Sequence, residues 1–299
     1  MPPFLLFIIA AYYNNRKNLM KKMTIRKAMA LLLAGTMMAS CGTKSGGQTA
    51  SAGQKPFDGV GIVAHRGYWN CEEGGFARNS VAALKAAQKA GFWGSEFDVN
   101  MTADSVLIVF HDSSINGKRI ESNPHSAFED FRLENGEPIP LLEQFLAAAQ
   151  PCPTTKLVFE MKQHSTPAIE DEAVRRSVAL LKTYGLLDPE RVMFISFSLH
   201  VCREFARLCP GFTVQYLGAN LWPAEVLDNG LNGIDLNHEA YMANGRFHDE
   251  AREKGMSINV WTVNNPERMQ QVIATGIDQL TTDEPMKARE LLGAQEVRK

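Results

Sequence analysis

Ile62-Val63-Ala64-His65-Arg66-Gly67 is the stretch from which the rest of the sequence can be interpreted. An apolar run with the composition of a β-strand ends there in a histidine and an arginine. Further on, Glu96-Phe97-Asp98 and Phe110-His111-Asp112 also place charged side chains at the ends of apolar runs. Two histidines, an arginine and a pair of alternating carboxylates are hard to obtain together by accident. The combination predicts a site that binds a metal and a phosphate.

Outside this stretch, short β-rich runs alternate with helical patterns from Gly59 onward, which predicts parallel βα units. The expected strands are residues 60–64, 94–99, 156–161, 191–197, 212–217, 233–236, 257–262 and 277–282. The expected helices are residues 79–90, 141–149, 169–184, 199–208, 222–229, 240–254 and 265–274, with a last one near 286–292. Eight strands, each eventually followed by a helix, over ~240 residues are the content of an α/β fold of the (β/α)8 TIM barrel type.

The second βα unit is the irregular one. Val106 to Phe110 forms an additional expected strand, which follows a polar turn and predicts a hairpin with residues 94–101. The polar segment 112–138 then predicts a small insertion over the barrel mouth. A doubly wound open sheet is the competing fold, but the even strand count and the lack of a Gly-rich dinucleotide turn favour the barrel.

The carboxylates predict the kind of ion. Glu96 and Asp98 alternate by two, so both side chains leave one face of a strand with Cα atoms ~6.6 Å apart. Glu160 and Lys162 repeat this geometry on the next strand. Three carboxylates without a matching His/Cys set favour Mg²⁺ or Ca²⁺ over zinc. The alternative is a structural ion network in which these acids pair with Arg66 and Lys162, although burying so many charges without a function is costly.

His65 and His111 flank this cluster in the sequence. Cleavage of a phosphodiester needs a base for the attacking oxygen and an acid for the leaving oxygen, and a histidine can serve as either near neutral pH. Arg66 offers a planar fork for two phosphate oxygens, and Lys162 offers a point charge for another. A lone histidine beside a strand is more often a core residue, but this pair predicts an acid and a base.

Composition limits the class of protein. The chain has 299 residues, 45% of them hydrophobic, and a formal net charge of -2. That length can bury a sizeable core. The near-neutral charge, without a Lys/Arg run interleaved with aromatics, gives no indication of nucleic-acid binding. No protein partner is inferred.

The first 41 residues have the pattern of a secretory signal. A basic segment precedes the apolar run 28–39, which is shorter than the roughly 20 residues that a membrane-spanning helix needs. Cys41 follows small residues and resembles a lipobox cysteine, which predicts an exported, membrane-anchored lipoprotein that is periplasmic or on the cell surface. A plain signal peptide or an uncleaved anchor is the alternative. Residues 1–19 suggest an over-extended start, 42–57 a flexible tether, and 58–299 the barrel domain.

Several short motifs together resemble the glycerophosphodiester phosphodiesterase family in order and spacing. They are His65-Arg66-Gly67, Asn79-Ser80, Glu96-x-Asp98, His111-Asp112, Glu160-x-Lys162, Trp261-Thr262-Val263-Asn264 and Thr282-Asp283-x-Pro285. The resemblance covers about residues 60–290. It implies a TIM barrel that hydrolyses glycerophosphodiesters to glycerol 3-phosphate and an alcohol in phospholipid and glycerol metabolism, with a divalent metal.

The same resemblance implies roles for individual residues. His65 and His111 are the acid/base pair. The remaining members are the metal ligands Glu96, Asp98 and Glu160, the phosphate-binding residues Arg66 and Lys162, and Trp261, which would line the pocket. Trp261 could equally be a core aromatic. The glycerol 2-hydroxyl of the substrate is expected to attack, which gives a cyclic phosphate that water then opens.

One departure from the family pattern concerns the substrate. The family usually has Pro-Glu-Asn-Thr after the first histidine, whereas Ala77-Arg78-Asn79-Ser80 stands here, so Arg78 replaces the glutamate. The chemistry is therefore better defined than the alcohol. Two alternatives stay open. One is a phospholipase D-like or lysophospholipase D-like enzyme acting on lipid phosphodiesters, and the other is a non-catalytic lipoprotein that binds a phosphoryl ligand.

Overall fold

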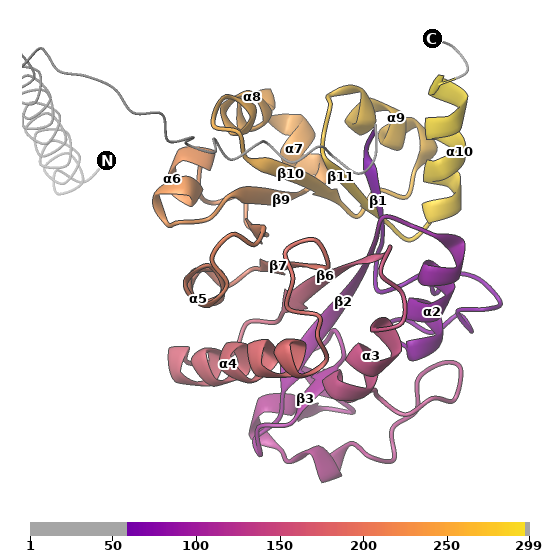
Figure 1. Cartoon of the computed structure of the whole chain (residues 1–299), viewed down its shortest axis with the longest axis vertical. Coiled ribbons are helices and arrows are strands. Elements are labelled where there is room, and N and C mark those ends of the chain that lie inside the picture. Colours follow the sequence, from indigo (N-terminus) through magenta and orange to yellow (C-terminus); the bar gives the residue numbers. More distant parts are fainter. Residues whose placement is uncertain (1–58, 297–299) are drawn as a thin grey trace, which may run out of the picture. The chain divides into compact units, whose positions relative to one another are not determined.

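A closed parallel barrel forms the described part of the chain, residues 59–296, in a computed structural model (Figure 1). Its sheet has nine strands in the order β1-β11-β10-β9-β8-β7-β6-β2-β3, and an additional β1–β2 pairing closes it. The parallel strands are β1 (Gly61–Ala64), β2 (Gly94–Met101), β6 (Lys156–Met161), β7 (Val192–Ser196), β8 (Val214–Tyr216), β9 (Gly233–Asn237), β10 (Ser257–Trp261) and β11 (Gln279–Thr282). The expected α/β TIM barrel is confirmed.

Helices follow the strands and cover the outside of the barrel. They are α2 (Val81–Ala90), α3 (Leu142–Ala149), α4 (Pro167–Thr183), α5 (Leu199–Leu208), α6 (Pro223–Asp228), α7 (His238–Ala243), α8 (Gly245–Glu253), α9 (Pro266–Ala274) and α10 (Pro285–Glu296). Within the described residues, no helix combines the length and the apolar character needed to cross a membrane.

The single helix expected over 240–254 is wrong, because the chain breaks at Asn244 into α7 and α8. The side chain of Asn244 accepts a hydrogen bond from the backbone N–H of Arg246 and so caps the second helix. Asparagine competes with the helical backbone in this way, which explains why it starts a new helix rather than continuing one.

Alternation along each strand divides the apolar residues into two layers. On β2, Phe97 points outward, where its ring stacks on Phe145 of α3 and meets Phe159 of β6 edge to face. Residues such as Val63 and Val158 belong to a second cluster inside the barrel. Because successive side chains of a strand point to opposite faces, the outward Phe97 leaves Glu96 and Asp98 facing the barrel interior.

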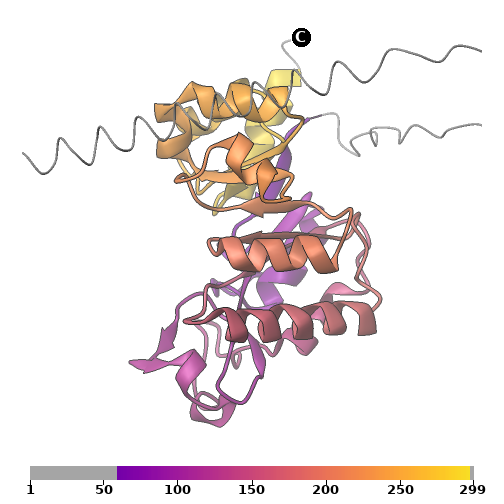
Figure 2. The same ribbon diagram turned by 90° about the vertical axis from the view of Figure 1, so that its left-hand side faces the viewer.

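The insertion after β2 begins as expected with an antiparallel hairpin. β3 (Leu107–Val109) pairs with the end of β2. Short elements follow: β4 (Ser114–Ile115), β5 (Lys118–Arg119), and the 3-10 turns η1 (Ile120–Ser122) and η2 (His125–Ala127). The segment has its own small core, which includes Ile115, Phe128 and Ile139. Figure 2 shows it in purple and magenta at one end of the barrel domain. The expected signal region (1–41) and tether (42–57) lie outside the described residues.

Candidate active site

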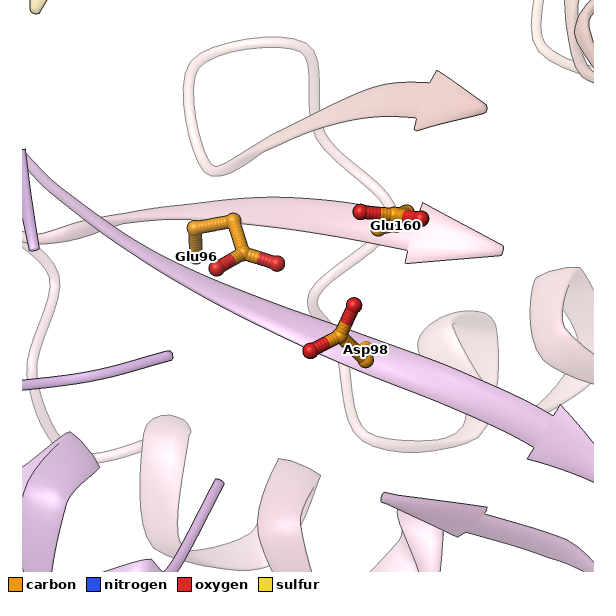
Figure 3. A group of neighbouring side chains, drawn as sticks. All are labelled: Glu96, Asp98 and Glu160. Atoms are coloured by element: carbon orange, nitrogen blue, oxygen red, sulfur yellow. The ribbon is translucent and has the colours of Figure 1, made fainter. Parts of the chain in front are cut away.

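Three buried carboxylates meet on two neighbouring strands (Figure 3). Glu96 and Asp98 extend from β2 and Glu160 from β6, where Asp98 and Glu160 are register partners. One oxygen from each carboxylate lies within 4.8 Å of the others. The structure therefore brings together the three residues expected to bind a metal.

Burial and mutual repulsion perturb the titration of this group. Burial, with the charges of Asp98 and Glu160, raises the pKa of Glu96 well above its usual range. Burial and the charge of Asp98 also raise the pKa of Glu160 to about 7. Burial would raise the pKa of Asp98 as well, but Lys162, His111 and Arg66 outweigh it and lower that pKa to about 2. A cation would relieve this repulsion.

The two expected phosphate-binding residues lie against these acids. Lys162 Nζ donates to Glu160 at 2.6 Å and to Asp98 at 3.2 Å. Arg66 Nε lies 3.6 Å from an oxygen of Asp98, and the backbone N–H of Arg66 donates to Glu96 at 2.6 Å. The ion network considered as the alternative is thus present, and both cations lie beside the carboxylates.

The donor set fits a hard divalent cation. Its members are all carboxylate oxygens, the ligands that Mg²⁺ and Ca²⁺ prefer. Glu96 Oε1 is buried without a hydrogen-bond partner among the described residues, although Oε2 of the same carboxylate is hydrogen-bonded. A buried acceptor without a partner is costly, so this oxygen is available as a ligand atom for a cation.

The loop after β1 is held in an uncommon conformation that aims its residues at this cluster. Arg66 and Asn79 have left-handed backbones, with φ of 56° and 58°. Asn79 Nδ2 donates to Asp98 at 2.8 Å, and the backbone N–H of Asp98 donates back to Asn79 Oδ1 at 3.1 Å. Gly67 is required because a Cβ atom there would lie 2.7 Å from the Cβ atom of Ala83. Such strain persists where several contacts determine the loop.

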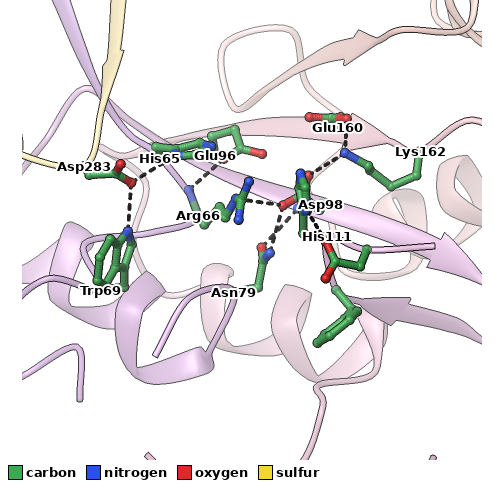
Figure 4. A network of polar contacts seen from close by, with 12 residues as sticks. His65, Arg66, Trp69, Asn79, Glu96, Asp98, His111, Glu160, Lys162 and Asp283 are labelled. Atoms are coloured by element: carbon green, nitrogen blue, oxygen red, sulfur yellow. Dashed lines mark hydrogen bonds and ion pairs between the residues drawn. The ribbon is translucent and has the colours of Figure 1, made fainter. Parts of the chain in front are cut away.

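His65 is held by a carboxylate from the opposite end of the sequence (Figure 4). Its Nδ1 lies 2.8 Å from Asp283 Oδ1. The same oxygen accepts from Trp69 Nε1 at 3.0 Å, and Oδ2 accepts from Asn264 at 2.7 Å. Burial would raise the pKa of Asp283, but the His65 contacts and these hydrogen bonds lower it to about 2. An ionised Asp283 only accepts, so Nδ1 of His65 carries the proton and Nε2 is the free nitrogen.

His111 follows β3 and lies on the other side of the cluster. Its Nδ1 lies 2.6 Å from Asp112 Oδ1, and its side chain is 39% exposed. Burial lowers the pKa of His111, which favours the neutral form, against the opposing effect of Asp98. Both expected acid/base residues therefore lie beside the carboxylates.

Trp261 ends β10 and is half-buried at the same edge of the barrel. Its Nε1 donates to the backbone carbonyl of Asp235 at 3.2 Å, and its ring meets that of the exposed Phe197 edge to face. Trp261 also packs against the apolar cluster inside the barrel. It therefore has both properties considered from the sequence, a core contact and a place near the mouth.

Sequence reasoning missed the residues that hold His65. Asp283 and Asn264 belong to motifs that resemble the family pattern but that carry no assigned role for them, and Trp69 lies outside those motifs. A signal existed, because Asp283 follows the last strand, and in a closed barrel the last strand lies beside the first.

Known proteins resemble the chain over nearly the whole described region. Residues 65–287 match the Glycerophosphoryl diester phosphodiesterase family. The crystal structure of a glycerophosphodiester phosphodiesterase from Parabacteroides distasonis is 40% identical, with a TM-score of 0.77, and the match covers 80% of this chain and 99% of that one.

Two more distant relatives match the chain over a similar length. A glycerophosphodiester phosphodiesterase of Caldanaerobacter subterraneus is 25% identical over 243 residues, 75% of this chain and 94% of the relative. A phosphodiesterase structure from Oleispira antarctica, in complex with the product sn-glycerol-3-phosphate, has a TM-score of 0.66 at 19% identity over 78% of this chain and 96% of that one. Because the family model matches from His65 to beyond the last strand, β11, the chain belongs to the glycerophosphoryl diester phosphodiesterase family.

Proposed function

We propose that this chain hydrolyses glycerophosphodiesters to glycerol 3-phosphate and an alcohol, with a divalent cation bound by Glu96, Asp98 and Glu160. The observation that carries the proposal is the three-carboxylate cluster, with its ligand atoms within 4.8 Å, between two histidines. Membership of the family makes the chain a phosphoric diester hydrolase. The product seen in the Oleispira antarctica structure supports the choice of a glycerol-based substrate.

The cation would supply charge stabilisation at a phosphoryl oxygen and lower the pKa of the attacking hydroxyl. Lys162 and Arg66 add positive charge next to the same carboxylates. In our proposal they bind the non-bridging phosphate oxygens and stabilise the charge that develops there in the transition state. Adding Mg²⁺ or Ca²⁺ back to metal-free protein distinguishes the two ions by the rate that each one supports.

The two histidines transfer the protons of the reaction. One removes the proton from the attacking glycerol 2-hydroxyl, and the other protonates the oxygen of the departing alcohol. Water then opens the cyclic phosphate with the roles reversed, and glycerol 3-phosphate is released. His65 Nε2 is available because Nδ1–H is committed to Asp283. Each proton transfer of this kind contributes typically 10²–10⁴ in rate.

The deciding experiment follows glycerol 3-phosphate release from a panel of glycerophosphodiesters after EDTA treatment, with Mg²⁺ or Ca²⁺ added back. We expect release that depends on the cation, and the rate with each ion identifies the cofactor. A folded, metal-loaded protein that releases nothing from any panel member would contradict the proposal and favour binding without turnover.

A lipid substrate is the second candidate, and exposed aromatics near the mouth favour it. Phe76, in the loop after β1, is 54% exposed, and Phe197, directly after β7, is 42% exposed. Two such rings could contact an acyl chain. Faster release of choline from lysophosphatidylcholine than from glycerophosphocholine would support this candidate, and the opposite order would support the first.

We also propose that the chain is an exported lipoprotein, anchored to a membrane through Cys41. Support comes only from the sequence of the first 41 residues, with its basic segment, apolar run and cysteine after small residues. Expression in a bacterial host with a labelled fatty acid would test it. We expect label in the wild type and none in Cys41→Ala, and label-free wild-type protein would rule the anchor out.

A further inference from the structure

Arg78 is an exposed cation near the candidate active site that the mechanism does not use. It lies in the loop between β1 and α2, where its guanidinium carbon is 3.8 Å from the centre of the Trp69 ring. Among the residues that the structure describes, it forms no ion pair with a carboxylate. Its charge is therefore available to a ligand.

The surroundings of Arg78 connect it to the site on two sides. Trp69, on which it stacks, donates from Nε1 to the same Asp283 oxygen that His65 contacts. The next residue along the chain, Asn79, hydrogen-bonds Asp98 at 2.8 Å. Arg78 thus lies at the rim of the site, one side chain removed from the residue that holds His65.

The loop holds this position firmly. Phe76 and Asn79, on either side of Arg78, both have left-handed backbones, with φ of 55° and 58°. The backbone N–H of Asn79 donates to the carbonyl oxygen of Arg66 at 3.0 Å. Stacking on Trp69 uses the face of the guanidinium and leaves its in-plane N–H groups free, in the fork that suits a carboxylate or a phosphate.

The other two cations of the site, Arg66 and Lys162, are already committed. Lys162 and Arg66 lie against the carboxylate cluster, where the reacting phosphate is expected. On the Trp69 side, Asp283 is hydrogen-bonded to Trp69 and Asn264 and contacts His65, and Glu284 pairs with Lys287 at 3.1 Å and accepts from Asn70 at 3.1 Å. Arg78 therefore remains as a cation without an ion-pair partner among the described residues, which indicates a place for a second anion on the substrate.

We propose that Arg78 binds an anionic group, a carboxylate or a phosphate, carried by the alcohol part of the glycerophosphodiester. This inference rests on the proposed function and narrows its substrate class. Glycerophosphodiesters with an acidic head group are then preferred over those with a neutral one. Arg78 acts on selection of the substrate and not on the cleavage itself.

The test uses the full chain and three substrates that differ only at the end of a three-carbon alcohol. Their alcohols are propan-1-ol, 3-hydroxypropanoate and propane-1,3-diol monophosphate. We would measure kcat/KM for each with the wild type, Arg78→Gln, Arg78→Lys and Arg203→Gln. Arg203 is an exposed arginine of the outer helix α5, so its replacement removes the same charge elsewhere. Dissociation constants in the His65→Ala background would be measured by calorimetry.

We expect the wild type to prefer an acidic member over the neutral one by about tenfold in kcat/KM and in affinity, the effect of one charge-assisted contact. Arg78→Gln should bring this ratio close to one, Arg78→Lys should keep part of it, and Arg203→Gln should leave it intact. The ratio of kcat/KM for the acidic substrate to kcat/KM for the neutral one separates a loss of selectivity from a general loss of activity transmitted through Trp69.

Three results would overturn the assignment: no preference in the wild type, a preference that survives in Arg78→Gln, or an equal loss on all three substrates. Absence of turnover with every substrate would instead remove the proposed reaction, and the calorimetric ratio would still decide whether Arg78 binds the anion.

Discussion

The two histidines of the site differ in how firmly they are oriented. His65 contacts Asp283, which is 20% exposed and held by Trp69 and Asn264. His111 contacts its own neighbour Asp112, which is 68% exposed. A partially buried carboxylate with two further donors determines ring orientation and tautomer better than a solvated one. His65 is therefore the more preorganised of the pair.

Replacing either histidine should abolish turnover without unfolding the protein. We expect His65→Ala and His111→Ala each to lower kcat by 10²–10⁴ or more, because each removes a proton-transfer group. The measurement is glycerol 3-phosphate release by metal-loaded protein, with circular dichroism and thermal unfolding as controls for the fold. His200→Ala is the matched variant, since His200 lies on the outer helix α5. Retained activity in either active-site variant would reject its role.

Asp283→Asn tests the positioning of His65. The amide keeps the shape but has one acceptor oxygen and no charge, so it holds the ring and its tautomer less firmly, and we expect kcat to fall about 10- to 1,000-fold with little change in KM. Asp130→Asn, at an exposed position in the insertion, is the control. A fall in kcat equal to that of the control would show that Asp283 does not act through His65.

Asp283→Asn should also change how the free energy of unfolding depends on pH. The pKa of Asp283 is lowered to about 2, below the value of about 3.9 in an unfolded chain. A lowered pKa stabilises the fold above the unfolded value, here by about 2 kcal/mol, and the stabilisation is lost as pH falls towards 2. Denaturant unfolding should therefore show a gap between the wild type and Asp283→Asn at pH 6 that narrows below pH 4. A gap independent of pH would mean that the charge of Asp283 is not responsible.

At the scale of elements, strand alternation positions the carboxylates. Adjacent inward side chains on β2 and one on β6 converge because Asp98 and Glu160 are register partners. This geometry could be predicted from the spacing of Glu96 and Asp98, because a strand has a period of two. Glu160 is expected from its place on the next strand, but its exact level opposite Asp98 depends on the strand register, which no local pattern contains.

Binding of a cation between β2 and β6 should stabilise the protein. At about a hundred times its Kd, Mg²⁺ or Ca²⁺ would add about 2.7 kcal/mol, which raises Tm by roughly 5–10 °C for a domain of this size. Glu96→Gln should abolish the shift, and Glu143→Gln, on the exposed side of α3, should not. The shift should be larger at pH 8 than at pH 6, because the cation must displace the protons that the raised pKa values of Glu96 and Glu160 retain. An unchanged shift in Glu96→Gln would exclude this site.

Most elements could be predicted from the sequence because the barrel repeats one local pattern. The ends of the eight expected parallel strands agree with the structure to within two residues. Apolar composition alone does not reveal the break at Asn244; the local signal is the Asn244-Gly245 pair, which is typical of turns, and the side-chain cap that Asn244 gives α8. The role of Asp283 depended on closure of the barrel, which joins segments 218 residues apart.

At the scale of the whole molecule, the barrel interior holds a network of buried polar side chains on β8–β11 as well as its apolar cluster. Beneath the site, Asn259 Nδ2 donates to Asp235 Oδ2 at 3.1 Å and lies 2.9 Å from Thr281 Oγ1. These contacts link strands β9, β10 and β11. A second group of hydrogen bonds joins Gln215, Ser257 and Gln279. Hydrogen bonds across the lumen thus connect strands whose outer faces pack on different helices.

Asp235 makes the stability of the whole barrel depend on pH. Burial raises its pKa well above the usual range, and Oδ1 has no partner among the described residues. The unfolded chain therefore loses this proton first as pH rises, so folding becomes less favourable above about pH 4 until the pKa of the folded protein is reached. Asp235→Asn keeps the shape and the contact with Asn259 but carries no charge in either state. We expect it to be nearly neutral at pH 4 and to become more stable than the wild type as the pH rises to 7, as measured by denaturant unfolding. A variant less stable than the wild type at pH 7 would show that Asp235 is ionised inside the barrel, with its charge balanced by the groups around it.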